Sequence, residues 1–180
     1  MKTYIALFRG VNVGGSNMLP MASLKTLIET CGCADVQTYI QSGNVVFRSS
    51  APDATKLAGR LGAAVLKGHG FEPRVLVLTR EELERAANGN PFPQAAANPK
   101  SVHLFFLAEK PKKPDFEALE ATKTRTERFA LKDRVFYLHT PDGFGTSKLA
   151  ARAEKLLGVA ATARNWRTVT VLLGMVNDSR

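Results

Sequence analysis

The chain has 180 residues, of which 44% are hydrophobic and 23% charged, so it can bury one core or two small ones. No apolar run approaches the roughly 20 residues that a membrane span requires, and no signal-peptide pattern is present, so we expect a cytoplasmic protein without a membrane partner. The net charge is +9, with +3 in residues 1–99 and +6 in residues 100–180. This excess favours phosphate-bearing partners, although basic charge also aids solubility.

The first apolar run, Tyr4 to Phe8, predicts a buried strand that feeds a glycine-rich loop. Arg9 could contact an anion there, and the loop glycines could bring backbone N–H groups close to it. The spacing fits neither the phosphate loop of nucleotide hydrolases nor the dinucleotide fingerprint. The alternative is that the glycines only satisfy turn geometry. The candidate binding residues of this loop are Arg9, Asn12, Gly14 and Gly15.

The next elements predict an antiparallel sheet with helices on one face. Helical spacing from Met21 to Cys31 is followed by strand-like runs over residues 36–41 and 45–48. Ser42, Gly43 and Asn44 between these runs predict a tight hairpin, in which Ser42 and Asn44 either bind a ligand or only make turn hydrogen bonds. A helix over residues 52–68 and a strand over 74–78 complete a βαββαβ order. The predicted class is therefore α+β, beginning with a ferredoxin-like subdomain.

A capping box predicts a third helix, because the Thr79 hydroxyl and the Glu82 side chain can each reach the other's backbone N–H. The helix should end before Asn90, and the proline-rich stretch to Pro99 predicts a link between two halves. The expected organisation is a ferredoxin-like subdomain over residues 1–79, a helix and linker over 80–99, and a second, smaller α+β subdomain over 100–180.

The second half begins with a strand over residues 101–107 and a short helix from Asp115 to about Lys123. A hairpin is expected over residues 127–139, and a helix from Leu149 should end at Gly158. The last helix is expected after a segment over residues 162–168, with its apolar stripe from Val169 to Val176. We detect no internal repeat.

Two segments of this half are further candidate sites. The order Gly-x-Gly-x-Ser-Lys over residues 143–148 is similar to a phosphate loop but too short, and Ser147 with Lys148 could bind an anion at a helix start. The alternative for Ser147 is a plain helix cap. Trp166 could stack on a base or ring, or could anchor the core. Its neighbours Arg164 and Asn165 join it as candidates.

The cysteines and histidines of the chain predict no metal site. Cys31 and Cys33 miss the CxxC spacing, and a disulfide is not expected across so short a loop in a reducing compartment, so we interpret both as packing residues. The three histidines show neither metal spacing nor the order of a catalytic triad. We expect no cofactor.

Four separated segments together are similar to a known family. The chain resembles the bacterial domain of unknown function family sixteen ninety-seven over nearly its whole length, and the resemblance implies an α+β fold of two subdomains and no assigned activity. The segments that carry it are Arg9-Gly10-Val11-Asn12-Val13-Gly14-Gly15, Thr38-Tyr39-Ile40-Gln41-Ser42-Gly43-Asn44-Val45-Val46-Phe47, Asp142-Gly143-Phe144-Gly145-Thr146-Ser147-Lys148-Leu149 and Thr162-Ala163-Arg164-Asn165-Trp166.

Three functions remain open from the sequence. The first hypothesis is a binding protein for a phosphorylated small molecule or nucleic acid. The second is an enzyme acting on a phosphate or amide substrate with Ser42, Ser147 or Lys148, which requires a base within hydrogen-bond reach. The third is an assembly module that uses the same loops as a subunit interface. The first hypothesis requires the four segments to lie on one face, and the sequence does not determine the oligomeric state.

Overall fold

A computed structural model describes residues 1–178 of the chain. The first half contains β1 (Lys2–Arg9), α1 (Met21–Thr30), β2 (Ala34–Tyr39), β3 (Asn44–Ser49), α2 (Ala54–His69), β4 (Arg74–Thr79) and α3 (Arg80–Asn88). The second half contains α4 (Gln94–Ala97), β5 (Val102–Leu107), α5 (Phe116–Thr122), β6 (Arg128–Lys132), β7 (Val135–His139), α6 (Lys148–Leu157), β8 (Ala161–Asn165) and α7 (Trp166–Asp178).

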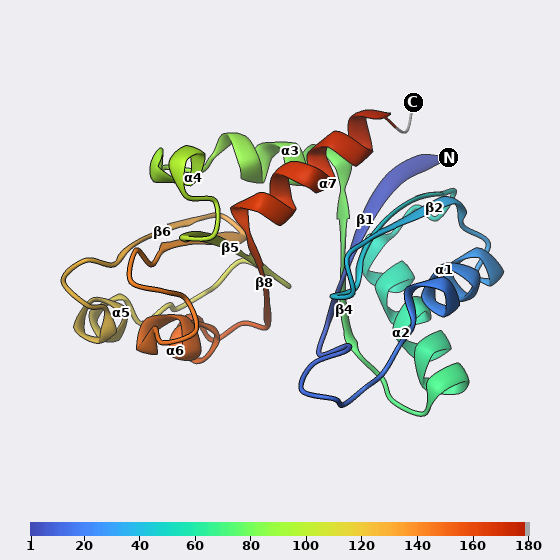
Figure 1. Cartoon of the computed structure of the whole chain (residues 1–180), viewed down its shortest axis with the longest axis horizontal. Helices are drawn as coiled ribbons and strands as arrows, with labels where there is room; N and C mark the ends of the chain where they lie inside the picture. The colour runs from blue at the N-terminus through green and yellow to red at the C-terminus, as the bar shows by residue number, and fades with distance from the viewer. Residues whose placement is uncertain (179–180) are drawn as a thin grey trace. The chain divides into compact units, whose positions relative to one another are not determined.

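The first sheet is antiparallel and has the strand order β2-β3-β1-β4. Its central strand β1 pairs with β3 on one side and β4 on the other, so that Tyr4 lies opposite both Phe47 and Thr79. Alternate residues of β1, among them Tyr4, Ala6 and Phe8, pack with α1 and α2 on one face of this sheet (Figure 1). The apolar stripe of each helix is buried against this face of the sheet.

The second sheet is also antiparallel and has the order β6-β7-β5-β8. Here β5 is the central strand, paired with β7 and β8. Phe105 and Phe136 meet edge to face, with their ring centroids 5.6 Å apart, on the side of the sheet where α5 and α6 pack. On the opposite side, the Tyr137 hydroxyl donates to the Ala86 carbonyl at 2.7 Å.

The two halves repeat one topology without a repeat in sequence. Each runs β, α, β, β, α, β and then a helix, and each sheet places its third strand beside the first and its fourth strand on the other side of the first. The α+β class with two subdomains is confirmed. Hydrophobic alternation and turns define such a topology, and many residue combinations satisfy them, so sequence self-similarity is not required.

Two compact units divide the chain. Unit 1 contains residues 1–85 and returns at residue 171, whereas unit 2 contains residues 86–170. The divisions fall inside α3 and inside α7. The sequence-based bounds at residues 79 and 100 stay a prediction.

The local signals at element ends agree with the structure in most places. The capping box is present, with Glu82 N–H donating to Thr79 Oγ1 at 3.2 Å and Thr79 N–H donating to Glu82 Oε2 at 2.9 Å. Gly158 ends α6 with a φ of 69°. Two elements were not predicted, namely the short helix α4 and the strand β8. The expectation that residues 162–168 only introduce the last helix is wrong, because residues 161–165 pair with β5.

Candidate functional site

The candidate residues of unit 1 gather at one end of the first sheet. Strand β1 ends at Arg9 and its antiparallel neighbour β3 begins at Asn44. Since antiparallel strands place the end of one beside the start of the other, the loop after β1 and the loop before β3 lie together. The topology thus brings these six candidates to one sheet end: Arg9, Asn12, Gly14, Gly15, Ser42 and Asn44.

The loop after β1 is itself a small hairpin. Ser16 N–H donates to the Val13 carbonyl at 3.0 Å, and Asn12 N–H donates to the Asn17 carbonyl at 3.1 Å. Gly14 and Gly15 form the tip, with φ of 58° and 75°. Two consecutive positive φ angles are what a type I′ turn requires, so turn geometry is a sufficient reason for both glycines.

Asn12 joins this hairpin to the neighbouring loops. Its Nδ2 donates to the carbonyls of Leu19 at 2.9 Å and Gln41 at 2.7 Å, and its Oδ1 accepts from Leu19 N–H at 2.7 Å. Its φ is 53°, a left-handed conformation that asparagine tolerates better than most residues. The side-chain amide therefore serves to position two loops.

Close packing and local hydrogen bonds hold the loop before β3 in place. Gly43 has a φ of 72°, and a Cβ placed on it would lie 2.6 Å from Phe8 Cβ. Its carbonyl accepts from Phe8 N–H at 2.8 Å. Asn44 is fully buried, and its Nδ2 donates to Ser42 Oγ at 2.9 Å and to the Tyr39 carbonyl at 3.3 Å. Of the two sequence interpretations for this turn, local hydrogen bonding accounts for the contacts of Asn44.

Arg74 is a residue at this end that the sequence analysis did not select. It begins β4 and lies directly opposite Arg9 in the sheet register, and both side chains are exposed. Like charges placed opposite each other in a sheet repel. The sequence alone does not reveal this pair of arginines, because it does not show that β1 pairs with β4.

The candidate residues of unit 2 gather at one end of the second sheet. Strand β7 ends at His139 and β8 ends at Asn165, both at the end where β5 begins. Helix α6 starts from the loop that follows β7, and α7 follows β8 directly. Two helix starts, each with the positive end of a helix dipole, therefore lie at the same end of this sheet.

Both helix starts are capped by a candidate residue. Ser147 Oγ accepts from Ala150 N–H at 3.0 Å, and Asn165 Oδ1 accepts from Thr168 N–H at 2.9 Å. The predicted alternative for Ser147, a helix cap, is confirmed. Ser147 is 6% exposed, and within residues 1–178 no histidine or carboxylate hydrogen bonds to it. Activation of this serine as a nucleophile would require such a base.

Several donors at this end have no acceptor in the part of the chain that the structure describes. They are the backbone N–H groups of Lys148 and Leu149, the Asn165 Nδ2 group and the Trp166 indole N–H. Lys148 and Arg167 are exposed, and within residues 1–178 neither forms an ion pair. This end of unit 2 is thus rich in unsatisfied donors and positive charge.

A ring stack that the sequence analysis missed connects β5 to the loop before α6. The rings of His103 and Phe144 are nearly parallel, with centroids 3.7 Å apart. Within the described residues His103 Nδ1 is buried without a partner, and burial lowers the pKa of His103 to about 4. His103 lies opposite Asn165 in the register. The imidazole is therefore neutral at pH 7.

The side chain of Arg164 does not share the face of Asn165. Successive residues of a strand point to opposite faces, and Arg164 lies opposite Leu104 while Asn165 lies opposite His103. Burial lowers the pKa of Arg164 to about 10, and its Nη1 donates to the Ala163 carbonyl at 2.9 Å. The candidates that the structure brings onto one sheet end in unit 2 are Ser147, Lys148, Asn165 and Trp166.

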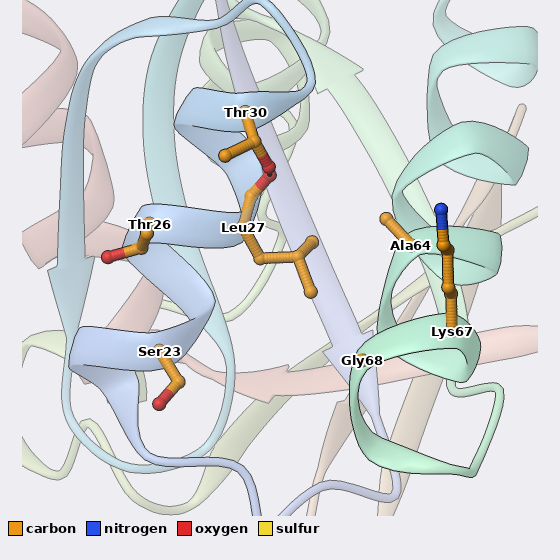
Figure 2. A pocket seen from close by; sticks show the side chains of 7 residues that line it. All are labelled: Ser23, Thr26, Leu27, Thr30, Ala64, Lys67 and Gly68. Carbon is orange, nitrogen blue, oxygen red and sulfur yellow. Dashed lines mark hydrogen bonds between the residues drawn. The ribbon is translucent and has the colours of Figure 1, made fainter.

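A groove of about 680 Å³ lies between α1 and α2, away from all these residues. In Figure 2, Leu27 points from α1 towards α2, where Gly68 leaves room for it. The hydroxyls of Thr26 and Thr30 donate to carbonyls of their own helix. With these two hydroxyls bonded to the helix backbone, Ser23 and Lys67 are the other lining residues whose polar side chains could orient a ligand.

The structure describes residues 1–178, and in that part of the chain no group of three or more His, Cys, Asp and Glu side chains is placed to hold a metal ion. In the same residues no helix is both long and apolar enough to span a bilayer.

A family model described as "Protein of unknown function (DUF1697)" matches residues 1–137. The chain belongs to this family. The match contains the first two of the four segments that carry the resemblance, and the other two lie beyond it. No curated protein matches this DUF1697 member.

A solved structure shares its fold. It is titled "The structure of conserved bacterial protein SP0830 from Streptococcus pneumoniae", and it is similar with a TM-score of 0.70 and 22% sequence identity. The similarity covers 97% of this chain and 98% of that one. The architecture of the DUF1697 member is thus that of a known fold over nearly its full length.

Proposed function

We propose that this protein binds a phosphate-bearing ligand, either a phosphorylated small molecule or nucleic acid, at the end of unit 2 where α6 and α7 begin. The observation that carries the proposal is the set of donors without protein acceptors there: the amide of the exposed Lys148, the Asn165 amide group and the Trp166 indole N–H. Phosphate oxygens accept hydrogen bonds from such groups.

The charge of unit 2 supports an anionic ligand. Residues 86–170 contain 14 Lys and Arg against 8 Asp and Glu, a net charge of +6. Lys148 and Arg167 add side-chain charge beside two helix starts. A positive potential at such a site raises both the affinity and the association rate of an anion.

The proposal assigns different tasks to the two groups of candidates. Lys148, Asn165 and Trp166 contact the ligand, whereas Asn12 and Asn44 shape the loops of unit 1 through bonds to backbone and Ser42. Arg9 with Arg74 offers unit 1 a second cationic position. Gly14 and Gly15 serve the hairpin tip.

Binding can be tested with a panel of phosphate, pyrophosphate, sugar phosphates, nucleotides, and single- and double-stranded nucleic acids. A ligand at 100 times its dissociation constant should stabilise the fold by about 2.7 kcal/mol, visible as a higher melting temperature. For a ligand that binds, calorimetry with Lys148→Gln should show an affinity at least about tenfold weaker, in keeping with a lost charge-assisted hydrogen bond.

Lys155→Gln is the matched control, because Lys155 is exposed at the opposite end of the same helix. It should leave the affinity unchanged. If affinity falls steeply with salt, the ligand is nucleic acid, whereas a shallow dependence indicates a small molecule. Equal losses in the two variants, or no binding from any member of the panel, would refute the proposal.

A second candidate function is assembly through the loops of unit 1. Val13, Met18 and Ile40 are 64%, 63% and 53% exposed, on the two loops that Asn12 joins. Exposed apolar side chains that gather in this way mark interaction surfaces. Gel filtration that shows a monomer at high concentration would remove this candidate.

A further inference from the structure

Cys31 and Cys33 flank a glycine at the point where the chain leaves α1. Cys31 N–H still donates to the carbonyls of Leu27 and Ile28, at 3.2 and 3.1 Å. Gly32 has a φ of 79°, and Cys33 leads into β2. The chain therefore reverses at a left-handed residue located between two thiols.

This turn keeps the two cysteines within disulfide reach. Two steps of 3.8 Å limit any such pair to about 7 Å between Cα atoms, and the left-handed conformation of the intervening Gly32 shortens that span. Disulfides accept Cα separations up to about 6.8 Å. The thiols also interact electrostatically, since the charge of Cys31 contributes to raising the pKa of Cys33.

The two thiols differ in access. Cys31 is half-buried, whereas Cys33 is 7% exposed and belongs to the core of unit 1. Burial is the main reason that the pKa of Cys33 is raised, while a hydrogen bond with Ser49 and the charge of Arg60 act in the opposite direction. A small molecule would thus meet Cys31 first.

We propose that Cys31 and Cys33 form a reversible dithiol–disulfide site that low-molecular-weight disulfides oxidise. The Cys31 thiolate attacks one sulfur of the small disulfide, whose S–S bond breaks and releases one thiolate. The Cys33 thiolate then attacks Cys31 Sγ and displaces the second. Two protein thiols lose two electrons and two protons, and the small disulfide becomes two thiols.

This site departs from the sequence-based interpretation that both cysteines only pack. That interpretation rested on the shortness of the loop and on an expected reducing compartment. A left-handed glycine removes the first objection, because it turns the chain back within three residues. The second is met by a disulfide that is reversible and forms only with an oxidant. The Arg60 Nη2 group donates to the Cys31 carbonyl at 2.7 Å and so helps to fix the turn, and its positive charge acts on the Cys33 thiol.

The test uses the folded full chain with oxidised glutathione at pH 8, followed by intact mass. The wild type should become about 2 Da lighter, and dithiothreitol should restore the original mass. Cys33→Ser should instead trap glutathione on Cys31 as a mixed disulfide, heavier by about 305 Da. Cys31→Ser should stay unmodified, because the remaining thiol is buried.

Circular dichroism on each variant shows whether the fold is kept. If a variant is unfolded, the mass change of the wild type decides the test. Closure of the mixed disulfide should speed up as pH rises, since Cys33 must lose its proton first. An unreactive wild type, a wild type that accumulates the glutathione adduct, or a folded Cys31→Ser that reacts as fast as wild type would each overturn the proposal.

Discussion

The two units share one topology but use their polar loop residues in opposite ways. In unit 1, the side-chain amides of Asn12 and Asn44 donate to backbone carbonyls and to Ser42, and Gly14 and Gly15 complete a turn. In unit 2, Asn165 and Trp166 retain donors that have no acceptor within residues 1–178. Similar loop compositions thus build a rigid turn in one unit and leave hydrogen-bonding capacity in the other.

The largest expected effect tests how tightly the loop of unit 1 is packed. Gly43→Ala places a Cβ 2.6 Å from Phe8 Cβ at a φ of 72°. Left-handed strain and overpacking together should reduce the free energy of unfolding by about 4 kcal/mol, measured by urea denaturation. Gly14→Ala is the matched control, with a positive φ but nothing within 4 Å, and should cost about 1 kcal/mol. Equal losses would show that packing at Gly43 is unimportant.

Asn12→Gly tests whether that side chain positions two loops. Glycine keeps the left-handed conformation but removes three hydrogen bonds to Leu19 and Gln41. The free energy of unfolding should fall by about 3 kcal/mol, since Leu19 is buried and its backbone groups lose their partner. Asn17→Gly removes one bond, to the Gly10 carbonyl, and should cost less. If Asn12→Gly lowers the free energy of unfolding by less than Asn17→Gly does, the Asn12 side chain does not position the two loops. The contrast between the two units then fails for unit 1.

His103 makes the stability of unit 2 depend on pH. Its folded pKa of about 4 lies below the ordinary value of 6.5, so the unfolded chain takes up the proton first and stability is lost as pH falls below 6.5. The contribution should be about 2 kcal/mol between pH 7 and pH 5. His103→Phe keeps a ring against Phe144 and should flatten this slope. Parallel pH profiles for the two proteins would show that His103 is not desolvated.

The smallest expected effect concerns the start of α6. Ser147→Ala removes the acceptor for Ala150 N–H and should cost about 1 kcal/mol in thermal unfolding. Thr146→Ala, one residue earlier and exposed, should stay within about 0.5 kcal/mol of the wild type. If Ser147→Ala also stays within that margin, the cap contributes little to the stability of unit 2.

Much of the fold could be predicted because its signals are local. The Thr79–Glu82 capping box and Gly158 each act within a few residues, and both are where the sequence placed them. Strand β8 was missed because its short run, from Ala161 to Asn165, has little strand character of its own. It exists through pairing with β5, some 60 residues earlier along the chain.

The candidate site was harder to predict for the same reason. The pattern selected Asn12 as a polar loop residue, but its partner Gln41 is 29 residues away, and only the fold reveals that bond. His103 gave no signal beyond being in a strand, and its stack on Phe144 depends on where the loop before α6 returns. Residue type identified the polar positions, and non-local contacts decide which of them remain available to a ligand.

The division of the chain inside α3 and α7 affects the order in which the protein can be completed during synthesis. Unit 1 contains the first 85 residues but also needs the stretch that begins at residue 171. A ribosome adding roughly 5–20 residues per second needs about 4–17 s to make the residues between. The part of the protein that emerges first can therefore be completed only after residues 86–170 have been made.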